Sequence, residues 1–422
     1  MKVISPSFIA CCCLVLAGAA SAATPCRPFP QHVNYTEGSI KPSRPQRELD
    51  SATAAFYDIW KARYFHAGCV SGQAYIFYNR EKTASSRDAI SVSEGHGYGM
   101  LLTAMFAGHD PKAQESFDQL FSYFRAHQSA ITPNLMSWQQ FQGCVDKKGD
   151  NDSASDGDLD IAYALLLADQ QWGSTGAVNY RAEALKVIAA VKSGEVNPAI
   201  PCLKPGDWAQ PDMAQSKDTR ISDFMPGHLR IFGLASGDAL WGRLVDQGYG
   251  LVAHLQSVHA PDTGLLPDFA QHLDSPAAVP AKRKYMESAF DGQYFYNACR
   301  CPWRIGVDYL LTGDPRAKGA LEKLNGFIEK KTVGDPEQIR AGYMLSGKVI
   351  HDDDTSLAFT APFAVAAMAD PSHPKWLDSL WKKIVDEPAT DDDYYGNTIK
   401  LLCMVTASGN WWVPKVEVVK AE

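Results

Sequence analysis

The sequence predicts an all-α protein built as a toroid of paired helices. Apolar residues recur at the spacing of an α-helix in about a dozen segments, with few strand-like stretches between them. No linker rich in proline, glycine or serine divides the 422 residues. Helices joined by short turns form antiparallel hairpins, so this many helices in one domain favour a ring of pairs over a small bundle.

The predicted helices follow one another along most of the chain. The first covers residues 47–65, where Leu49, Phe56 and Trp60 stand at helical spacing, and a strand-like stretch follows at 73–92. Further helical patterns cover 97–108, 112–127, 158–172, 179–193, 228–235, 239–257, 299–312, 316–330, 356–368, 374–385 and 393–407. Strands are therefore expected to be few, short and confined to loops.

Three of the turns share an Asp-Pro pair, at Asp110-Pro111, Asp314-Pro315 and Asp370-Pro371. Because aspartate is a favoured N-cap and proline fits the first helical position, each pair is predicted to open a helix. The helices that start near Gly97, Asp156 and Cys299 instead follow polar clusters. If alternate helices run parallel, these clusters gather at one end of the toroid.

The first 22 residues read as a secretory signal peptide. Lys2 supplies the positive charge, residues 8–20 the apolar core, and Ala20-Ser21-Ala22 the cleavage site. Export to the periplasm or the medium is therefore expected. Residues 23–44 are predicted to be an N-terminal extension, and residues 45–415 a single helical domain.

Charge and cysteine content exclude several functions. The net charge is −8 with no basic cluster, so neither nucleic acid nor an anionic membrane is expected as a partner. Of ten cysteines, three lie in the signal; the odd remainder should include disulfides and at least one free thiol. Cys299 and Cys301 lack the spacing of a zinc site, and neither a metal nor a cofactor is expected.

The polar clusters contain the candidates for chemistry. Glu94 stands among alternating glycines in residues 93–100, which fits either a carboxylate facing a groove or a flexible loop. Residues 150–160 hold five aspartates where one N-cap would suffice, without the spacing of a calcium loop. Residues 294–304 mix aromatic rings with arginines, which suits either sugar stacking or helix packing. Trp138 is a further stacking candidate.

These clusters resemble glycoside hydrolase family 8. Ala154-Ser155-Asp156-Gly157-Asp158 and the apolar positions after it look like the family signature. The segments 93–100, 299–309 and 408–411 are also similar, so the resemblance runs from about residue 50 to 412. It implies an (α/α)6 barrel and inverting, endo-type hydrolysis of β-1,4-linked polysaccharides.

The resemblance also implies residue roles. Glu94 matches the proton donor and Asp156 the aspartate that supports the transition state. Many members have an aspartate base where this chain has Asn297, and an amide cannot take a proton from water. In a chitosanase-containing subgroup a loop glutamate is the base, which implies Glu287 here; Asp291 is the second candidate.

The sequence supports three hypotheses about the substrate and the activity. Asn297 with Glu287, and Asp223 as a partner for a glucosamine ammonium, favour an endo-chitosanase, and a monomer is expected. The alternative is an endo-β-1,4-glucanase (a cellulase or lichenase) or a dual enzyme, and the third is a glycan-binding protein that lost catalysis. Sugar contacts are expected from six residues: Tyr98, Trp138, Asp223, Tyr296, Asn297 and Arg300.

Overall fold

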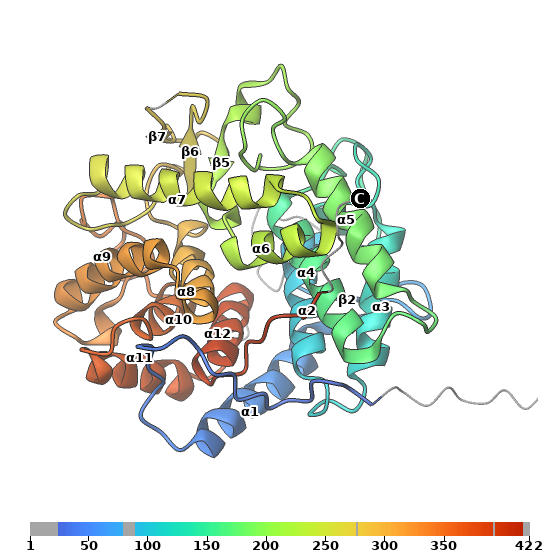
Figure 1. Cartoon of the computed structure of the whole chain (residues 1–422), viewed down its shortest axis with the longest axis horizontal. Helices are drawn as coiled ribbons and strands as arrows, with labels where there is room; N and C mark the ends of the chain where they lie inside the picture. Colours follow the sequence, from blue (N-terminus) through green and yellow to red (C-terminus); the bar gives the residue numbers. More distant parts are fainter. Residues whose placement is uncertain (1–23, 79–88, 276, 391–392, 417–422) are drawn as a thin grey trace, which may run out of the picture.

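The computed structural model describes residues 24–78, 89–275, 277–390 and 393–416 (Figure 1). The described part contains twelve α-helices: α1 (Gln46–Tyr64), α2 (Ser93–Met105), α3 (Ala113–Ala126), α4 (Ser155–Trp172), α5 (Tyr180–Gly194), α6 (Pro226–Ser236), α7 (Leu240–Val258), α8 (Cys301–Thr312), α9 (Pro315–Thr332), α10 (Leu357–Ala367), α11 (Pro374–Asp386) and α12 (Tyr394–Ala407). The predicted signal peptide lies outside the described residues.

The helices form two concentric rings (Figure 1). Helices α2, α4, α6, α8, α10 and α12 contact one another in sequence, and α12 contacts α2, which closes the inner ring. Each inner helix packs against an outer one: α3, α5, α7, α9 and α11 follow their partners, and α1 pairs with α12. The predicted (α/α)6 barrel is confirmed.

Burial explains which helices lie inside. Every residue of α10 is buried, and all of α12 except Tyr395, as expected for helices with neighbours on all sides. Outer helices are amphipathic: α11 buries Trp376, Leu380 and Ile384 on one face and leaves lysines on the other. The apolar pattern of the sequence thus sorts the helices into the two rings.

Helices α2 and α4 begin three or four residues earlier than the apolar pattern indicated. The glycines of residues 93–100 belong to the helix, and the flexible-loop reading of this segment is wrong. A Cβ on Gly97 would lie 2.8 Å from the Cβ of Asp160, and one on Gly157 would lie 2.5 Å from the backbone of Ser93. The glycines therefore let α2 and α4 cross closely, which places Glu94 and Asp156 in first helical turns.

The Asp-Pro prediction is confirmed at one turn and wrong at two. Asp314 caps α9 by accepting the backbone N–H of Arg316, with Pro315 in the first helical position. Asp110 and Asp370 instead lie three and four residues before their helices, α3 and α11. Each accepts the backbone N–H two residues ahead at 2.9 Å and so closes a separate turn.

In the part of the chain that the structure describes, seven short strands form three antiparallel sheets outside the rings. Strands β1 (Phe65–Ala67) and β2 (Ala74–Ile76) pair, as do β3 (Ala89–Val92) and β4 (Gln139–Phe141). The third sheet contains β5 (Thr219–Arg220), β6 (Phe269–Gln271) and β7 (Val279–Pro280). Strand β3 leads directly into α2, so the second sheet fixes the start of the helix that carries Glu94.

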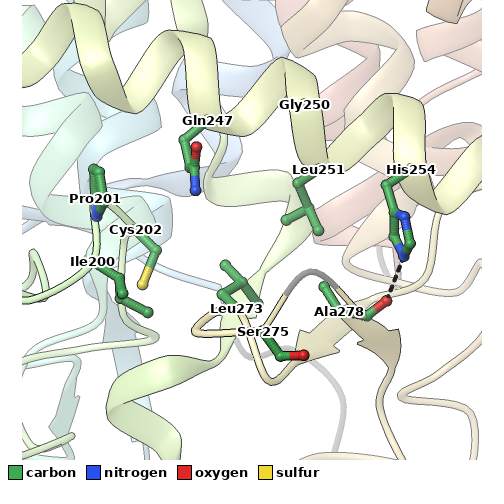
Figure 2. A pocket seen from close by; sticks show the side chains of 10 residues that line it. All are labelled: Ile200, Pro201, Cys202, Gln247, Gly250, Leu251, His254, Leu273, Ser275 and Ala278. Atoms are coloured by element: carbon green, nitrogen blue, oxygen red, sulfur yellow. Dashed lines mark hydrogen bonds between the residues drawn. The ribbon is translucent and has the colours of Figure 1, made fainter.

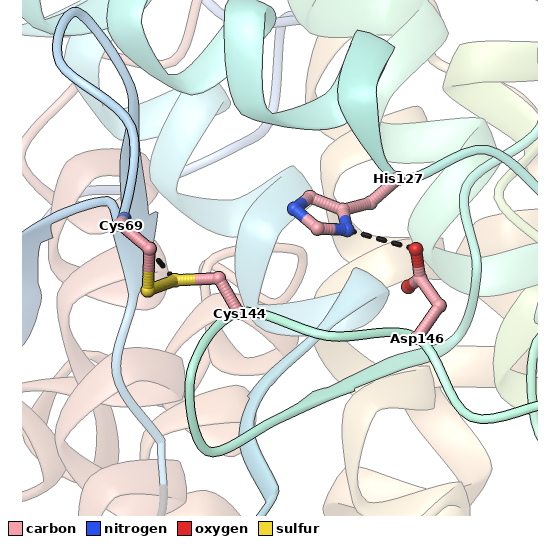
Figure 3. Close-up of a disulfide and its surroundings, with 4 residues drawn as sticks. All are labelled: Cys69, His127, Cys144 and Asp146. Atoms are coloured by element: carbon pink, nitrogen blue, oxygen red, sulfur yellow. Dashed lines mark hydrogen bonds and ion pairs between the residues drawn. A yellow bond between two sulfur atoms is a disulfide. The ribbon is translucent and has the colours of Figure 1, made fainter.

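A disulfide links the β1–β2 turn to the loop that follows β4 (Figure 3). Cys69, in the β1–β2 turn, is bonded to Cys144 in the loop after β4, where Asp146 also pairs with His127 at 2.9 Å. Among the described residues Cys26, Cys202, Cys299, Cys301 and Cys403 are free thiols. The expectation of both paired and free cysteines is confirmed.

Residues 24–44, which belong to the predicted N-terminal extension, lie against the barrel at the C-terminal ends of inner helices. Backbone N–H groups of Phe29, Val33 and Ile40 donate to Ala107, Gly409 and Met368, which follow α2, α12 and α10. The distances are 2.7, 2.7 and 2.9 Å. These bonds pair backbone carbonyls in the turns that follow the three inner helices. The opposite end of the ring remains for the polar clusters.

Candidate active site

The three polar clusters meet at the N-terminal ends of the inner helices. Arg300, just before α8, contacts the carboxylate of Glu94 and donates from Nη1 to Asp156 Oδ2 at 2.9 Å. Glu94 and Arg300 are 206 residues apart in the chain. The prediction that the clusters gather at one end of the toroid is confirmed.

Arg300 connects most of the polar groups at this end. Its Nη1 also donates to Tyr98 Oη at 3.1 Å, and its Nη2 donates to Ser222 Oγ at 2.7 Å and Asn297 Oδ1 at 3.1 Å. The side chain is 1% exposed. A guanidinium so enclosed fixes the carboxylates around it.

The two central carboxyl groups differ in electrostatic environment. Burial raises the pKa of Glu94 above its ordinary value, and the charge of Asp156 adds to the effect against the opposing charge of Arg300. Burial also acts to raise the pKa of Asp156, but Arg220 and Arg300 outweigh it and hold that pKa below the ordinary value. Glu94 is therefore the group that keeps its proton as pH rises, while Asp156 is ionised.

Glu287 stands on a loop that a buried aspartate organises. Asp291, fully buried, accepts the backbone N–H groups of Met286, Glu287 and Ser288 at 2.7, 3.1 and 2.7 Å. The Glu287 side chain is 43% exposed. Asp291 thus holds the loop, and Glu287 is the carboxylate that faces solvent.

Asn297 joins Glu287 to the centre. Its Nδ2 donates to Glu287 Oε2 at 2.7 Å, while its Oδ1 accepts from Arg300. Asp268 Oδ1 accepts the backbone N–H groups of Phe295, Asn297 and Ala298 and so fixes the turn before α8. Burial raises the pKa of Asp268 to about 8.

The other expected sugar contacts lie in different environments. Tyr98 is fully buried, and its hydroxyl donates to Glu94 Oε1 at 3.1 Å. Asp223 is also fully buried and pairs with Arg220 at 3.2 Å; burial raises its pKa to about 7. Trp138 and Tyr296 are 36% and 37% exposed. The backbone oxygen of Trp138 accepts from Ser93 N, which places Trp138 beside the first turn of α2.

Two of the cavities in the described structure can be compared with the positions of the candidate residues. One of about 350 Å³ is lined by Tyr296 and by Ser356 and Asp393, the N-caps of α10 and α12. Another, of about 170 Å³, lies between α7 and the turn after β6, where His254 Nε2 pairs with the carbonyl of Ala278 (Figure 2). Of the candidate residues, Tyr296 lines the first cavity and none lines the second.

Sequence reasoning missed Arg220 and Asp268. Arg220 precedes the Ser222-Asp223 pair by two residues, and Asp268 precedes β6; neither position has a spacing that marks it. Within the described residues, no group of three or more His, Cys, Asp or Glu side chains is arranged to hold a metal ion. No described helix combines the length and apolar character needed to cross a bilayer.

A buried carboxyl pair behind Asp156 predicts a pH-dependent stability. Asp158 and Glu195 interact, and burial raises the pKa of Glu195 to about 8. The folded protein thus holds a proton that an unfolded chain releases above about pH 4.3, so the free energy of unfolding falls as pH rises through this window. In calorimetry, the Tm of the wild type should fall between about pH 5 and pH 8, and the Tm of Glu195→Gln should fall less.

The matched control is Glu322→Gln on the exposed side of α9, half-exposed at 51%. Its Tm should follow the wild-type curve. An equal fall of Tm with pH in wild type and Glu195→Gln would contradict the assignment of a proton to the Asp158–Glu195 pair.

A closed double ring of helices with a carboxyl group that keeps its proton beside an ionised one fits a glycoside hydrolase, which needs a protonated acid beside ionised carboxylates. The chain belongs to glycosyl hydrolases family 8, whose family model matches residues 48–409.

Similar proteins include two bacterial enzymes. A β-glucanase from Niallia circulans is 43% identical over 411 residues, which cover 97% of this chain and 97% of that protein. An endoglucanase from Bacillus sp. (strain KSM-330) is 38% identical over 394 residues, covering 92% and 82%. Both alignments cover more than nine-tenths of this chain.

Solved structures show the same architecture. The apo structure of a β-1,3-1,4-glucanase from Paenibacillus sp. X4 aligns with a TM-score of 0.87 at 42% identity, covering 92% of this chain and all of that one. A reducing end xylose-releasing exo-oligoxylanase aligns with a TM-score of 0.72 at 19% identity, over 92% and 99% of the chains, and thus shares the fold.

Proposed function

We propose that this protein is an exported, monomeric, inverting endo-β-glucanase that cleaves β-1,4 bonds in mixed-linkage or cellulosic glucan. The observation that carries the proposal is the cluster in which Arg300 holds Glu94 and Asp156 together at the N-terminal ends of the inner helices. The relatives named β-glucanase and endoglucanase support glucan as the substrate. They favour the alternative over the chitosanase expected first.

The structure also weakens one argument for chitosan. Asp223 was expected to attract a glucosamine ammonium, but its carboxylate is buried and paired with Arg220. A buried, paired carboxylate offers little to a cation arriving from solvent. The remaining argument is the Asn297–Glu287 pair, which concerns the base and not the sugar substituent.

In the proposed reaction Glu94 is the general acid. Its proton passes to the glycosidic oxygen as the bond to the anomeric carbon breaks, so the leaving chain departs as a neutral alcohol. The raised pKa of Glu94 keeps that proton available near neutral pH. Asp156, held ionised by Arg220 and Arg300, supports the positive charge that develops on the sugar.

Glu287 is the proposed general base. Its exposed carboxylate takes a proton from a water molecule, and the water oxygen bonds to the anomeric carbon from the face opposite the leaving group. A β-linkage then yields an α-anomer. Asp291, the second candidate, is fully buried and uses its carboxylate oxygens on the loop backbone.

Trp138 and Tyr296 are the proposed stacking surfaces for sugar rings. Both aromatic side chains are about one-third exposed, and they flank the centre from the β4 side and the α12 side. Tyr98, Asn297 and Arg300 are proposed to act mainly by orienting the catalytic carboxyls, since each of them is bonded to one or more of these.

The substrate proposal is tested by reducing-end release from lichenan, carboxymethylcellulose and chitosan under identical conditions. We expect the highest kcat/KM on lichenan, with the α-anomer as the first product in ¹H NMR. Preferred cleavage of chitosan would overturn the glucan proposal in favour of the chitosanase. Glycan binding without cleavage of any of the three would establish the catalytically inactive alternative.

A further inference from the structure

Arg220 contacts two carboxyl groups near the N-terminal ends of the inner helices. Its Nη2 donates to Glu287 Oε1 at 2.7 Å and its Nη1 to Asp223 Oδ2 at 3.2 Å. Its charge also acts on Asp156. The side chain is only 10% exposed, so little water reaches the guanidinium.

The position of Arg220 is fixed by the protein before any substrate binds. It is the second residue of β5, where it pairs with Phe269 of β6, and its guanidinium lies 5.2 Å from the centre of the Phe269 ring. Asp223, fully buried, follows in a short 3₁₀ turn and holds the other amino group. Arg220 is therefore a rigid anchor.

Glu287, in contrast, is half-exposed and would have freedom without such an anchor. Arg220 binds its Oε1, and Asn297 Nδ2 binds its Oε2 at 2.7 Å. An ionised carboxylate has about two acceptor positions on each oxygen. The two donors thus set the plane of the carboxylate and leave one acceptor position on each oxygen for water.

We propose that Arg220, braced by Asp223, is a positioning residue that aims the Glu287 carboxylate at the attacking water. The inference rests on the proposed function, in which Glu287 is the base. In this proposal Asp223 fixes the position of Arg220 and does not contact the sugar. Because an arginine fork reaches two carboxylates through separate amino groups, lysine keeps the charge but cannot make both contacts.

The test is a double-mutant cycle on the full-length enzyme with lichenan. Arg220→Met, Arg220→Lys, Glu287→Gln and the combined variants are assayed for kcat and KM, with thermal unfolding of each. We expect Arg220→Met to lower kcat about 100-fold with KM within about twofold, and Arg220→Lys to lie between it and wild type. In the Glu287→Gln background Arg220→Met should change kcat less than about twofold, since its effect passes through Glu287.

Arg230 provides the matched control. It is another arginine that bridges two aspartates, Asp308 and Asp314, but at the far end of the barrel. Arg230→Met should leave kcat near wild type in the folded fraction. If Arg220→Met lowers kcat by the same factor in both backgrounds, its role is structural and the inference is overturned.

The outcomes separate the inference from the proposed function. Full turnover by Glu287→Gln would remove Glu287 as the base and with it the proposed mechanism. Loss of turnover in Glu287→Gln together with full activity in Arg220→Met would overturn the role of Arg220 alone. If Arg220→Met does not fold, the same cycle with Arg220→Lys decides, because that variant keeps the buried charge.

Discussion

Replacing Glu94 by glutamine is expected to lower kcat on lichenan about 1,000-fold, because an amide of the same shape has no acidic proton to give the leaving oxygen. Glu94 is 21% exposed and contacts Arg300 and Tyr98. A glutamine oxygen can accept from both, so KM and Tm should change little. Steady-state kinetics and thermal unfolding measure these effects.

A substrate that needs no acid assistance sharpens this prediction. A dinitrophenyl β-cellobioside has a leaving group that departs as a stable anion. On this substrate Glu94→Gln should therefore keep most of the rate of the wild-type enzyme. Glu287→Gln is the matched control and should be slow on both substrates, since water activation is needed in each. Equal losses of Glu94→Gln on the two substrates would show that Glu94 is not the proton donor.

The pH profile follows from the same assignment. Burial raises the pKa of Glu94, and the acid is active only while protonated. Activity on lichenan should therefore fall as pH rises through this raised pKa, and the alkaline limb should be absent with the dinitrophenyl substrate.

Arg300→Met is expected to have the largest effect on stability, a loss of about 3–5 kcal/mol in the free energy of unfolding. The substitution leaves the ionised carboxylate of Asp156 without one of the two guanidinium groups that hold its charge, in a place from which water is largely excluded. It also removes the bonds to Ser222 and Asn297. Urea unfolding measures the loss.

Two further variants separate this effect from a general loss of packing. Arg316→Met removes an exposed arginine that pairs with Asp246 and Asp314, and should cost less than about 1 kcal/mol. Asp156→Asn added to Arg300→Met should restore part of the stability, because the uncompensated carboxylate is then gone. Failure of this partial rescue would contradict the electrostatic origin of the loss.

The helices and the two central carboxyls were predictable because their signals are local. The apolar spacing of each segment predicts its helix, and the boundaries agree with the structure within a few residues. The starts of α2 and α4 were placed too late because glycines such as Gly97 and Gly157 resemble a loop in sequence. Only the crossing of these helices shows that the glycines provide room.

The site around Glu94 and Asp156 needed the tertiary structure. Their shared partner Arg300 is more than a hundred residues away from each, and Arg220 is 67 residues from Glu287. The sequence singled out Asp223 and Asp291 as candidates, yet burial and hydrogen bonds assign them to Arg220 and to the Glu287 loop.

The sequence by itself determined the ring of helical hairpins and the proton-donor candidate, because both follow from patterns within single segments. The tertiary structure decided which carboxyl keeps its proton and which arginines hold the others, because charge, burial and hydrogen bonding act between segments that meet only in the folded chain.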